Sequence, residues 1–397
     1  MIGLIAGDIM GSLFEHIQVK RKDVGILEQC SRFTDDTVLA IAIADAIISK
    51  QPYEQMVIEY GSRYPDAGYG AGFYRWLHSI ERKPYNSFGN GAAMRVGPVG
   101  LLFASADEVV SEAKRTAQIT HNHPRGIAGA QATALAVHLA YIGKGKRIIR
   151  DTIQEQFGYN LTRTLDEIRK DYSFDMSCDR TVPEALTAFL ESESVEDSIR
   201  NAISLGGDSD TLAAIAGVIA EAHFKQVSPS TIALVIKKLD APLLDKLVDV
   251  YDSLTYDSTR SEISRLERTY RKLVSPSTQA VYRPSPLSDT LLVNFARFNA
   301  RGNPSADIEL LDQFNYENYL FDFSNYQDGF SAPQVGHILA PSRKKRRSFL
   351  INVPLWIRDF LKGRDANQMV DVFETAEAVY TYLKEKTTIQ MQQLVIM

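Results

Sequence analysis

Apolar and small residues recur at helical spacing through the long N-terminal part of the chain. Residues 37–49 are apolar almost all round, which predicts a buried helix rather than a surface helix. Residues 126–141 and 212–223 are rich in alanine and glycine, with apolar positions three and four residues apart. None of these segments shows the alternation of β-branched residues that is expected of a strand. The pattern predicts one all-α domain over residues 1–272, whose small residues let neighbouring helices approach closely.

The composition changes near Ser275. Residues 273–286 are rich in proline and serine and are predicted to be a linker. Residues 287–397 are more aromatic and irregular, with a candidate strand over Phe349–Val353 and a candidate helix over Thr375–Lys384. We therefore predict a smaller mixed α/β accessory domain. Its aromatic cluster at residues 314–330 is predicted to be core, with a surface for a protein partner as the alternative.

Composition and charge exclude several classes of protein. The 397 residues are 45% hydrophobic and 23% charged, with a formal net charge of -5, which is typical of a globular chain and unlike a nucleic-acid-binding one. The one basic run, Arg343–Arg347, is interpreted as a solvated loop. No apolar run approaches the ~20 residues of a membrane span, and the N-terminus lacks a secretory pattern. We expect a cytoplasmic protein that binds neither membrane nor nucleic acid.

Four short segments carry acids or glycines that helix formation does not require. Two cysteines are too few for a thiolate zinc site or a disulfide framework, so the acids draw attention instead. The four segments are Gly7–Glu15, Phe33–Thr37, Gly89–Arg95 and Gly206–Thr211.

In the second and fourth segments, two acids and a threonine come directly before a strongly apolar helix. Capping by Thr34 or Ser209 explains one acid per helix, because a carboxylate favours the positive end of the helix dipole. It explains two acids poorly, because neighbouring carboxylates repel each other. Carboxylate and hydroxyl oxygens are the ligands that Mg²⁺ and Mn²⁺ prefer, so two such ions sharing one site are plausible, with Glu15 nearby. The candidate ligands are Thr34, Asp35, Asp36, Asp208, Asp210 and Thr211.

Taken in order along the chain, five motifs resemble those of the ADP-ribosylglycohydrolases, the family that includes the activator of dinitrogenase reductase. The resemblance covers roughly residues 1–225 and does not reach the C-terminal region. The motifs are Gly-Asp-x-x-Gly-Ser-x-x-Glu at residues 7–15, Phe-Thr-Asp-Asp-Thr at 33–37, Gly-Asn-Gly-Ala-Ala-Met-Arg-Val at 89–96, Thr-His-Asn-His-Pro at 120–124, and Gly-Gly-Asp-Ser-Asp-Thr at 206–211.

The resemblance implies an all-α orthogonal helical bundle with a dinuclear Mg²⁺ or Mn²⁺ centre held by the six candidate ligands. It implies catalytic roles among Glu15, Asp36 and Asp208, without assigning the acid and the base. The Gly89-Asn90-Gly91 turn would approach a diphosphate with bare backbone. The remaining residues that it places at the substrate are Ser87, Tyr69, Phe73 and His121, with the two aromatic rings as candidates for stacking on adenine.

The implied function is metal-dependent removal of ADP-ribose from a modified acceptor, most readily a protein side chain, with arginine favoured by analogy. Two other readings stay open. The chain could bind ADP-ribose or a partner without turnover, or it could be an immunity or regulatory protein that opposes a particular ADP-ribosyltransferase.

Overall fold

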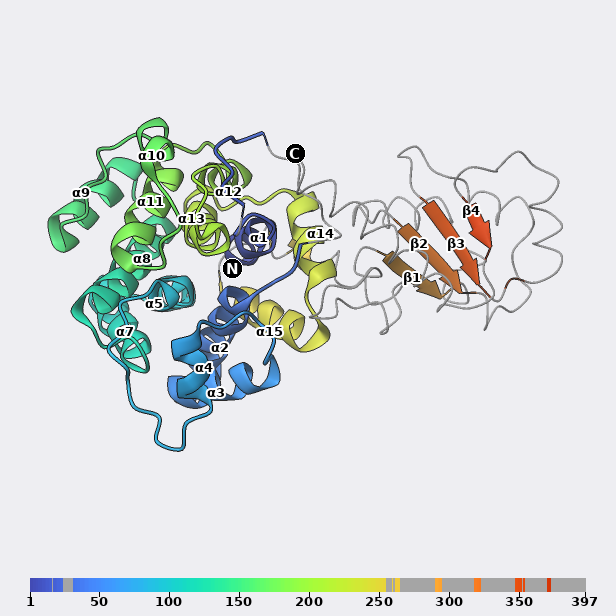
Figure 1. Ribbon diagram of the computed structural model, residues 1–397, viewed down its shortest axis with the longest axis horizontal. Helices are drawn as coiled ribbons and strands as arrows, with labels where there is room; N and C mark the ends of the chain where they lie inside the picture. The colour runs from blue at the N-terminus through green and yellow to red at the C-terminus, as the bar shows by residue number, and fades with distance from the viewer. Residues whose placement is uncertain are drawn as a thin grey trace. The chain divides into compact units, whose positions relative to one another are not determined.

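The computed structural model describes residues 1–15, 17–23, 31–254, 259, 261–264, 290–294, 318–322, 347–351, 353 and 370–372. The chain divides into two compact units, one within residues 1–263 that is helical, and one that contains four strands (Figure 1). The helices are α1 (Ile2–Gly11), α2 (Asp35–Ser49), α3 (Tyr53–Arg63), α4 (Ala71–Leu77), α5 (Gly91–Met94), α6 (Gly97–Leu102), α7 (Ala106–Gln118), α8 (Pro124–Tyr141), α9 (Lys146–Phe157), α10 (Leu165–Asp171), α11 (Cys178–Leu190), α12 (Val195–Ile203), α13 (Ser209–Phe224), α14 (Pro229–Lys238) and α15 (Ala241–Asp252).

The three helices predicted from the apolar pattern are confirmed as α2, α8 and α13. Each begins two or three residues before its predicted start, because the polar residues ahead of the apolar run already have helical geometry. The prediction of an all-α N-terminal domain is therefore confirmed for the described residues. Several helix starts carry the side-chain caps that such sequences favour, and α7 has a full capping box between Ser105 and Glu108.

The helix α13 is the centre of the helical unit. Its residues from Ser209 to Ala222 are all buried. It packs against α1, α8, α11 and α12, which surround it in Figure 1. A helix that is apolar on every side can be stable only when neighbours cover every side, so this arrangement follows from the sequence of α13.

Glycines bring α1 and α13 into backbone contact. A Cβ atom on Gly3 would lie 2.3 Å from the carbonyl oxygen of Gly217, and one on Gly217 would lie 2.1 Å from that of Gly3. Further along the same face, a Cβ on Gly7 would lie 2.2 Å from the carbonyl oxygen of Ala213, and one on Gly11 would lie 2.5 Å from Asp210 Cα. No real side chain fits at these distances, so this spacing of the helices requires glycine.

The described part of the second unit is a four-stranded parallel sheet. Its strands are β1 (Thr290–Asn294), β2 (Asn318–Asp322), β3 (Arg347–Ile351) and β4 (Val370–Val372), in the order β1-β2-β3-β4. Leu292 pairs with Leu320, which pairs with Phe349. The strand expected near Phe349 is thus confirmed, displaced by two residues. The linker at 273–286 and the helix expected at 375–384 lie outside the described residues, and the domain boundaries stay predictions. Among the described helices, none combines the length and apolar character needed to cross a membrane.

Replacing Gly217 by alanine tests the contact between α1 and α13. Helix propensity alone would favour alanine by about 1 kcal/mol. Steric overlap with the Gly3 carbonyl outweighs this, so we expect a net loss of about 2 kcal/mol in the free energy of unfolding, measured by urea denaturation.

The matched control is Gly145→Ala. Gly145 precedes α9 with φ -69, and a Cβ there would meet no atom within 4 Å. Because alanine is a poorer N-cap than glycine, this variant should lose up to about 1 kcal/mol, which is clearly less than the loss expected for Gly217→Ala. Equal stability of the two variants would contradict the proposed basis of the helix contact.

Candidate metal centre

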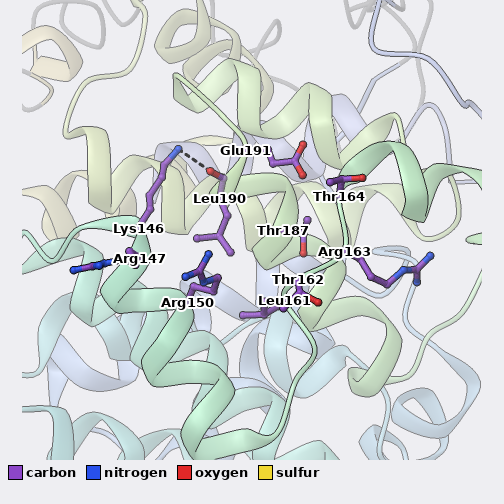
Figure 2. A pocket seen from close by; sticks show the side chains of 10 residues that line it. All are labelled: Lys146, Arg147, Arg150, Leu161, Thr162, Arg163, Thr164, Thr187, Leu190 and Glu191. Carbon is purple, nitrogen blue, oxygen red and sulfur yellow. Dashed lines mark hydrogen bonds between the residues drawn. The ribbon is translucent and has the colours of Figure 1, made fainter.

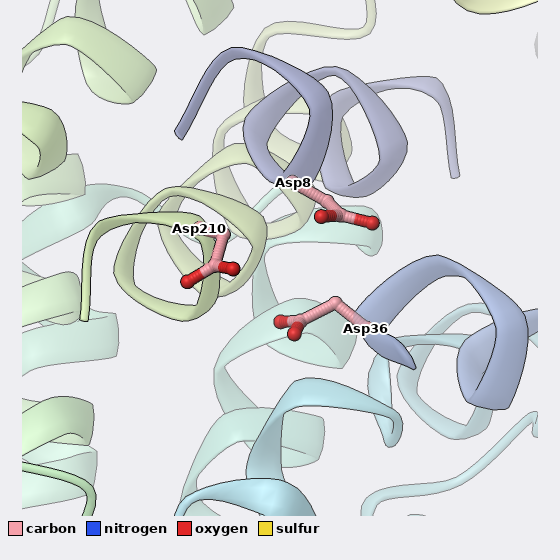
Figure 3. Close-up of side chains that lie close together, drawn as sticks. All are labelled: Asp8, Asp36 and Asp210. Atoms are coloured by element: carbon pink, nitrogen blue, oxygen red, sulfur yellow. The ribbon is translucent and has the colours of Figure 1, made fainter. Parts of the chain in front are cut away.

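Three helices bring one carboxylate each to a common point. Asp8 comes from the last turns of α1, Asp36 from the start of α2 and Asp210 from the start of α13, and the three side chains point toward one another in Figure 3. One oxygen from each lies within 4.8 Å of the others, and all three residues are buried. The N-termini of α2 and α13, where the sequence predicted the candidate ligands, therefore face each other, and α1 lies beside both.

A second group of three acids shares Asp210 with the first. Glu15, Asp208 and Asp210 also place one carboxylate oxygen each within 4.8 Å of the others. Asp208 is buried, whereas Glu15 is half-buried. Two adjoining clusters of three acids, which share Asp210, could hold one cation or two.

Asp8 anchors the start of α2. Its carboxylate accepts hydrogen bonds from the backbone N–H of Thr34 at 2.8 Å and of Thr37 at 3.1 Å, and from both threonine hydroxyls. Because the Thr34 hydroxyl donates to Asp8 and accepts from the Asp36 N–H, one of its two lone pairs remains available to a cation. Asp8 belongs to the first of the five motifs but was not among the residues predicted for the site. An acid within an otherwise apolar helix was the signal that could have identified it.

Thr34 caps α2 as predicted, with its side chain accepting from the Asp36 N–H. The alternative cap at Ser209 is wrong, because Asp208 occupies that position and Ser209 is the first helical residue. The Ser209 hydroxyl instead donates to the Gly11 carbonyl at 2.9 Å, which ties α13 to α1. The Thr211 hydroxyl donates to Asp36 at 3.3 Å and so connects the N-termini of α13 and α2.

Asp35 lies at the edge of this cluster rather than within either group of three. Its backbone N–H donates to the Ala67 carbonyl at 2.9 Å, and its Oδ1 is 3.7 Å from the position that a Cβ would take on Gly68. Gly68 has a φ of +96, where a larger residue would be strained. The loop before α4 is thereby held against the carboxylate, and Asp35 remains half-buried.

The carboxylates carry the electrostatic signature of a cation site. Burial, together with charges of neighbouring acids, raises the pKa of Asp35 to about 8 and holds the pKa values of Asp36 and Asp210 well above the ordinary range. Burial also raises the pKa of Asp8 to about 6. Asp36 Oδ1 is buried and has no hydrogen-bond partner among the described residues. A buried carboxylate oxygen without a partner is costly, and a hard divalent cation would satisfy it, so these residues fit Mg²⁺ or Mn²⁺.

Asn90 supports the cluster with its side chain. Its amide nitrogen donates to Asp208 at 2.7 Å and to the Thr181 hydroxyl at 3.1 Å, and the side chain is buried. Its backbone N–H donates to the Met176 carbonyl at 2.7 Å. The Asn90 side chain thus contacts a candidate ligand directly. The sequence predicted a role for the backbone of this turn but not for this side chain.

The other predicted substrate residues fall into two places. Ser87, Gly89, Gly91 and His121 lie together, because the His121 Nε2 atom is 3.6 Å and 3.2 Å from the Cβ positions of Gly89 and Gly91, and the Gly89 N–H donates to Ser87 at 3.1 Å. The Tyr69 and Phe73 rings contact each other, with centroids 4.8 Å apart. Phe73 is only 6% exposed, so Tyr69, which is half-buried, is the more accessible of the two rings.

Two exposed apolar side chains lie beside the glycine turn and were not among the residues predicted from the sequence. Phe88 is 42% exposed and Met176 is 58% exposed, and an isolated antiparallel bridge between Gly89 and Ser177 keeps their segments together. The Arg125 guanidinium lies 4.0 Å from the centre of the Phe88 ring. Neither residue belongs to a periodic pattern of apolar positions, because both lie in loops.

A cavity of about 450 Å³ between α9 and α11 is separate from the acidic cluster (Figure 2). Lys146, Arg147, Arg150 and Arg163 line it, but their charged groups do not converge. Lys146 reaches the Leu190 carbonyl at 3.3 Å, and Arg163 pairs with Asp171 at 2.6 Å. The cavity therefore lacks the convergent polar groups of a specific ligand site.

Comparison with known proteins agrees with this geometry. Residues 1–254 match the ADP-ribosylglycohydrolase family. The human protein named ADP-ribosylhydrolase ARH3 is 27% identical over 304 residues, covering 56% of this chain and 84% of the human one. The Rhodospirillum rubrum ADP-ribosyl-[dinitrogen reductase] glycohydrolase is 24% identical over 254 residues, covering 56% of this chain and 83% of that one. A solved structure titled ADP-ribosylglycohydrolase-related protein complex is 21% identical, with a TM-score of 0.47, and covers 67% of this chain and 95% of that chain.

This chain belongs to the ADP-ribosylglycohydrolase family, which is a family of hydrolases. The predicted family and the predicted enzyme class are therefore confirmed. The family match covers residues 1–254 and leaves the four strands outside it.

The raised carboxylate pKa values predict how metal affects stability. In the metal-free protein the folded state holds protons that the unfolded state, with pKa values near 4, has released, so stability should fall as the pH rises from about 4 to about 8. Mg²⁺ needs the ionised carboxylates and should raise the melting temperature more at pH 8 than at pH 5. Thermal unfolding with Mg²⁺ and with chelator measures this. Equal stabilisation at both pH values would contradict the assignment.

Replacing Asn90 by alanine tests its contact with Asp208. Because removal of a group that orients a metal ligand commonly costs 10–100-fold in affinity, we expect metal affinity to fall by about that factor. Isothermal titration with Mn²⁺ measures the loss. Asn160→Ala is the control, since Asn160 is an exposed loop residue whose side chain, among the described residues, accepts hydrogen bonds from Thr162 alone. Unchanged Mn²⁺ affinity in the Asn90 variant would show that Asp208 does not need this support.

Proposed function

We propose that this protein is a metal-dependent hydrolase that removes ADP-ribose from a modified protein side chain through a dinuclear Mg²⁺ or Mn²⁺ centre. The observation that carries the proposal is the pair of carboxylate groups joined through Asp210. Two adjoining acidic sites suit two cations better than one, because a single ion would leave part of the buried negative charge unbalanced.

The proposed ligands are the six residues predicted from the sequence: Thr34, Asp35, Asp36, Asp208, Asp210 and Thr211. In this proposal Asp8 adds its negative charge to the first acidic group and fixes Thr34 and the start of α2 through its four hydrogen bonds. Asn90 fixes Asp208 in the same manner from the other side.

When bound, the two cations would supply positive charge that holds ribose hydroxyls and favours ionisation of a water molecule. The reaction breaks the bond between the anomeric carbon of ribose and the acceptor atom, through an oxocarbenium-like state. The acceptor leaves with one proton, and the anomeric carbon gains the hydroxyl of water. A carboxyl group beside the scissile bond must exchange a proton with the water or with the leaving atom.

Glu15 is the carboxylate best placed for this exchange. It lies within the second acidic group but remains half-buried, whereas Asp36 and Asp208 are 2% and 6% exposed. A substrate would therefore reach Glu15 while the two aspartates act as ligands. The diphosphate would lie at the Gly89–Gly91 turn, where Ser87 and His121 also lie, and adenine would stack on an exposed ring beside it, for which Phe88 and Tyr69 are candidates.

The proposed acceptor is a protein side chain. The name of the Rhodospirillum rubrum relative states a protein acceptor, dinitrogen reductase. This supports a protein substrate here, with an arginine linkage as the first to test and a serine linkage as the second.

The experiment measures ADP-ribose release from arginine-modified and serine-modified test proteins, with Mg²⁺, with chelator, and in two variants. Loss of proton transfer in Glu15→Gln should lower kcat by about 10²-fold or more while ADP-ribose still binds. Asp36→Asn should fail through weaker metal binding and recover partly at high Mg²⁺. Glu155→Gln, on the exposed side of α9, is the control and should match the parent.

Release that survives the chelator would contradict the metal centre. Tight ADP-ribose binding without release from either substrate would favour a binding module, or a protein that opposes an ADP-ribosyltransferase by occlusion. Full activity in Glu15→Gln would remove Glu15 from the proton transfer.

A further inference from the structure

Arg95 is a fully buried cation that feels the charge of Asp35 but hydrogen-bonds to none of the described acids. Its Nη2 donates to the Thr116 carbonyl at 3.0 Å and to the Thr120 hydroxyl oxygen at 2.9 Å. Arg95, Thr116 and Thr120 are all 0% exposed. Burying a guanidinium is costly, so its contacts invite a functional explanation.

The Thr120 hydroxyl, which accepts from Arg95, also lies within hydrogen-bond distance of His121. Thr120 Oγ1 lies 2.7 Å from His121 Nδ1. A guanidinium can only donate, so the hydroxyl oxygen must accept from Arg95, and its single proton is free to be given onward. His121 Nδ1 is the acceptor within hydrogen-bond distance. The Tyr85 phenol also interacts with Thr120, and the second lone pair of the hydroxyl oxygen can accept from it.

If Nδ1 accepts, the ring carries its proton on Nε2. Nε2 faces the glycine turn, because the Cβ positions of Gly91 and Gly89 lie 3.2 Å and 3.6 Å from it. Among the described residues none hydrogen-bonds to Nε2. Burial, together with the charge of Arg95, lowers the pKa of His121 to about 3, so the ring is neutral at pH 7.

We propose that Arg95 and Thr120 are positioning residues that hold His121 as its Nε2–H tautomer, so that this N–H donates to a diphosphate oxygen at the Gly89–Gly91 turn. The inference rests on the proposed function for the identity of the ligand. The assignment of the tautomer rests on the hydrogen bonds alone.

This role for His121 accounts for the buried Arg95, the Thr120 hydroxyl and the glycines that surround its ring. A neutral donor with a fixed direction can bind an anionic oxygen without adding a titrating charge beside the metal ligands. The glycines leave the space in front of Nε2 open, since a side chain at either position would meet the ring. Arg95 and the Tyr85 hydroxyl together make the arrangement directional, because between them they can fill both lone pairs of the Thr120 oxygen, one of which Nδ1–H would otherwise use.

The first measurement is a long-range ¹H–¹⁵N spectrum of protein labelled in histidine, at pH 7, with His121→Asn to assign the resonance. We expect a protonated Nε2 and an unprotonated Nδ1 in the parent and in Thr120→Ser. Thr120→Val keeps the shape but removes the donor, and the Nδ1 resonance should lose its hydrogen-bond shift. A parent spectrum with Nδ1 protonated would overturn the proposal, whatever the enzyme hydrolyses.

The second measurement is binding of ADP and of ADP-ribose in the presence of Mg²⁺. Loss of the anchoring bond should weaken both ligands about threefold to tenfold in Thr120→Val, with Thr120→Ser within about twofold of the parent. Thr187→Val is the matched control, because Thr187 is a buried threonine whose hydroxyl donates to the Pro183 carbonyl of its own helix and has no described contact with Arg95, Thr120 or His121. Equal weakening in the control would show a merely structural effect and overturn the proposal.

Two further outcomes separate this inference from the proposed function. If ADP-ribose binding weakens but ADP binding does not, the contact is to the distal ribose and the diphosphate assignment is wrong. If the parent binds ADP with the expected tautomer yet releases no ADP-ribose from any modified protein, the proposed hydrolysis fails while the role of Arg95 and Thr120 stands.

Discussion

The backbone contact between α1 and α13 is the constraint on which the site depends. Glycines at positions 3, 7 and 11 of α1 let the helix axes approach closely enough for backbone atoms to meet. Asp8 and Asp210 lie on these two helices, so the distance between their carboxylates is set by the packing rather than by either loop. Ser209 reinforces it by donating to the Gly11 carbonyl at the end of the contact. A metal centre built on rigid helices keeps its ligands in place without relying on loop conformation.

The same packing works against stability at the place where it creates the site. Bringing Asp8, Asp36 and Asp210 together in a buried position raises their pKa values, which means that the folded protein resists ionising them. Fourteen consecutive buried residues of α13 help to compensate for this cost. The apolar helices and the acidic cluster therefore depend on each other, because the packing energy of the helices offsets the cost of burying the acids.

The sequence predicted the helices and brought together most of the acidic residues, because helical periodicity and adjacent acids are local signals. It could not predict that Asp8 would bond to Thr34, 26 residues away, or Asn90 to Asp208, 118 residues away, because such contacts depend on how the helices pack. The choice of Ser209 as a cap failed for the same reason, since its hydroxyl is used by α1. The exposed Phe88 and Met176 lie in loops, where no periodic pattern distinguishes a binding surface from an ordinary turn.

Two kinds of support surround the proposed substrate position, and they differ in charge. On the metal side, acids are held by donors from Thr34, Thr37 and Asn90, so that their remaining lone pairs can meet a cation. On the turn side, the buried charge is a cation, Arg95, which reaches the surface only through a hydroxyl and a neutral ring. An anionic diphosphate with a ribose beside it needs both environments within one ligand length. The Arg95 guanidinium bonds to Thr116 and Thr120 rather than to a carboxylate, so it does not occupy the oxygens that the divalent ions would need.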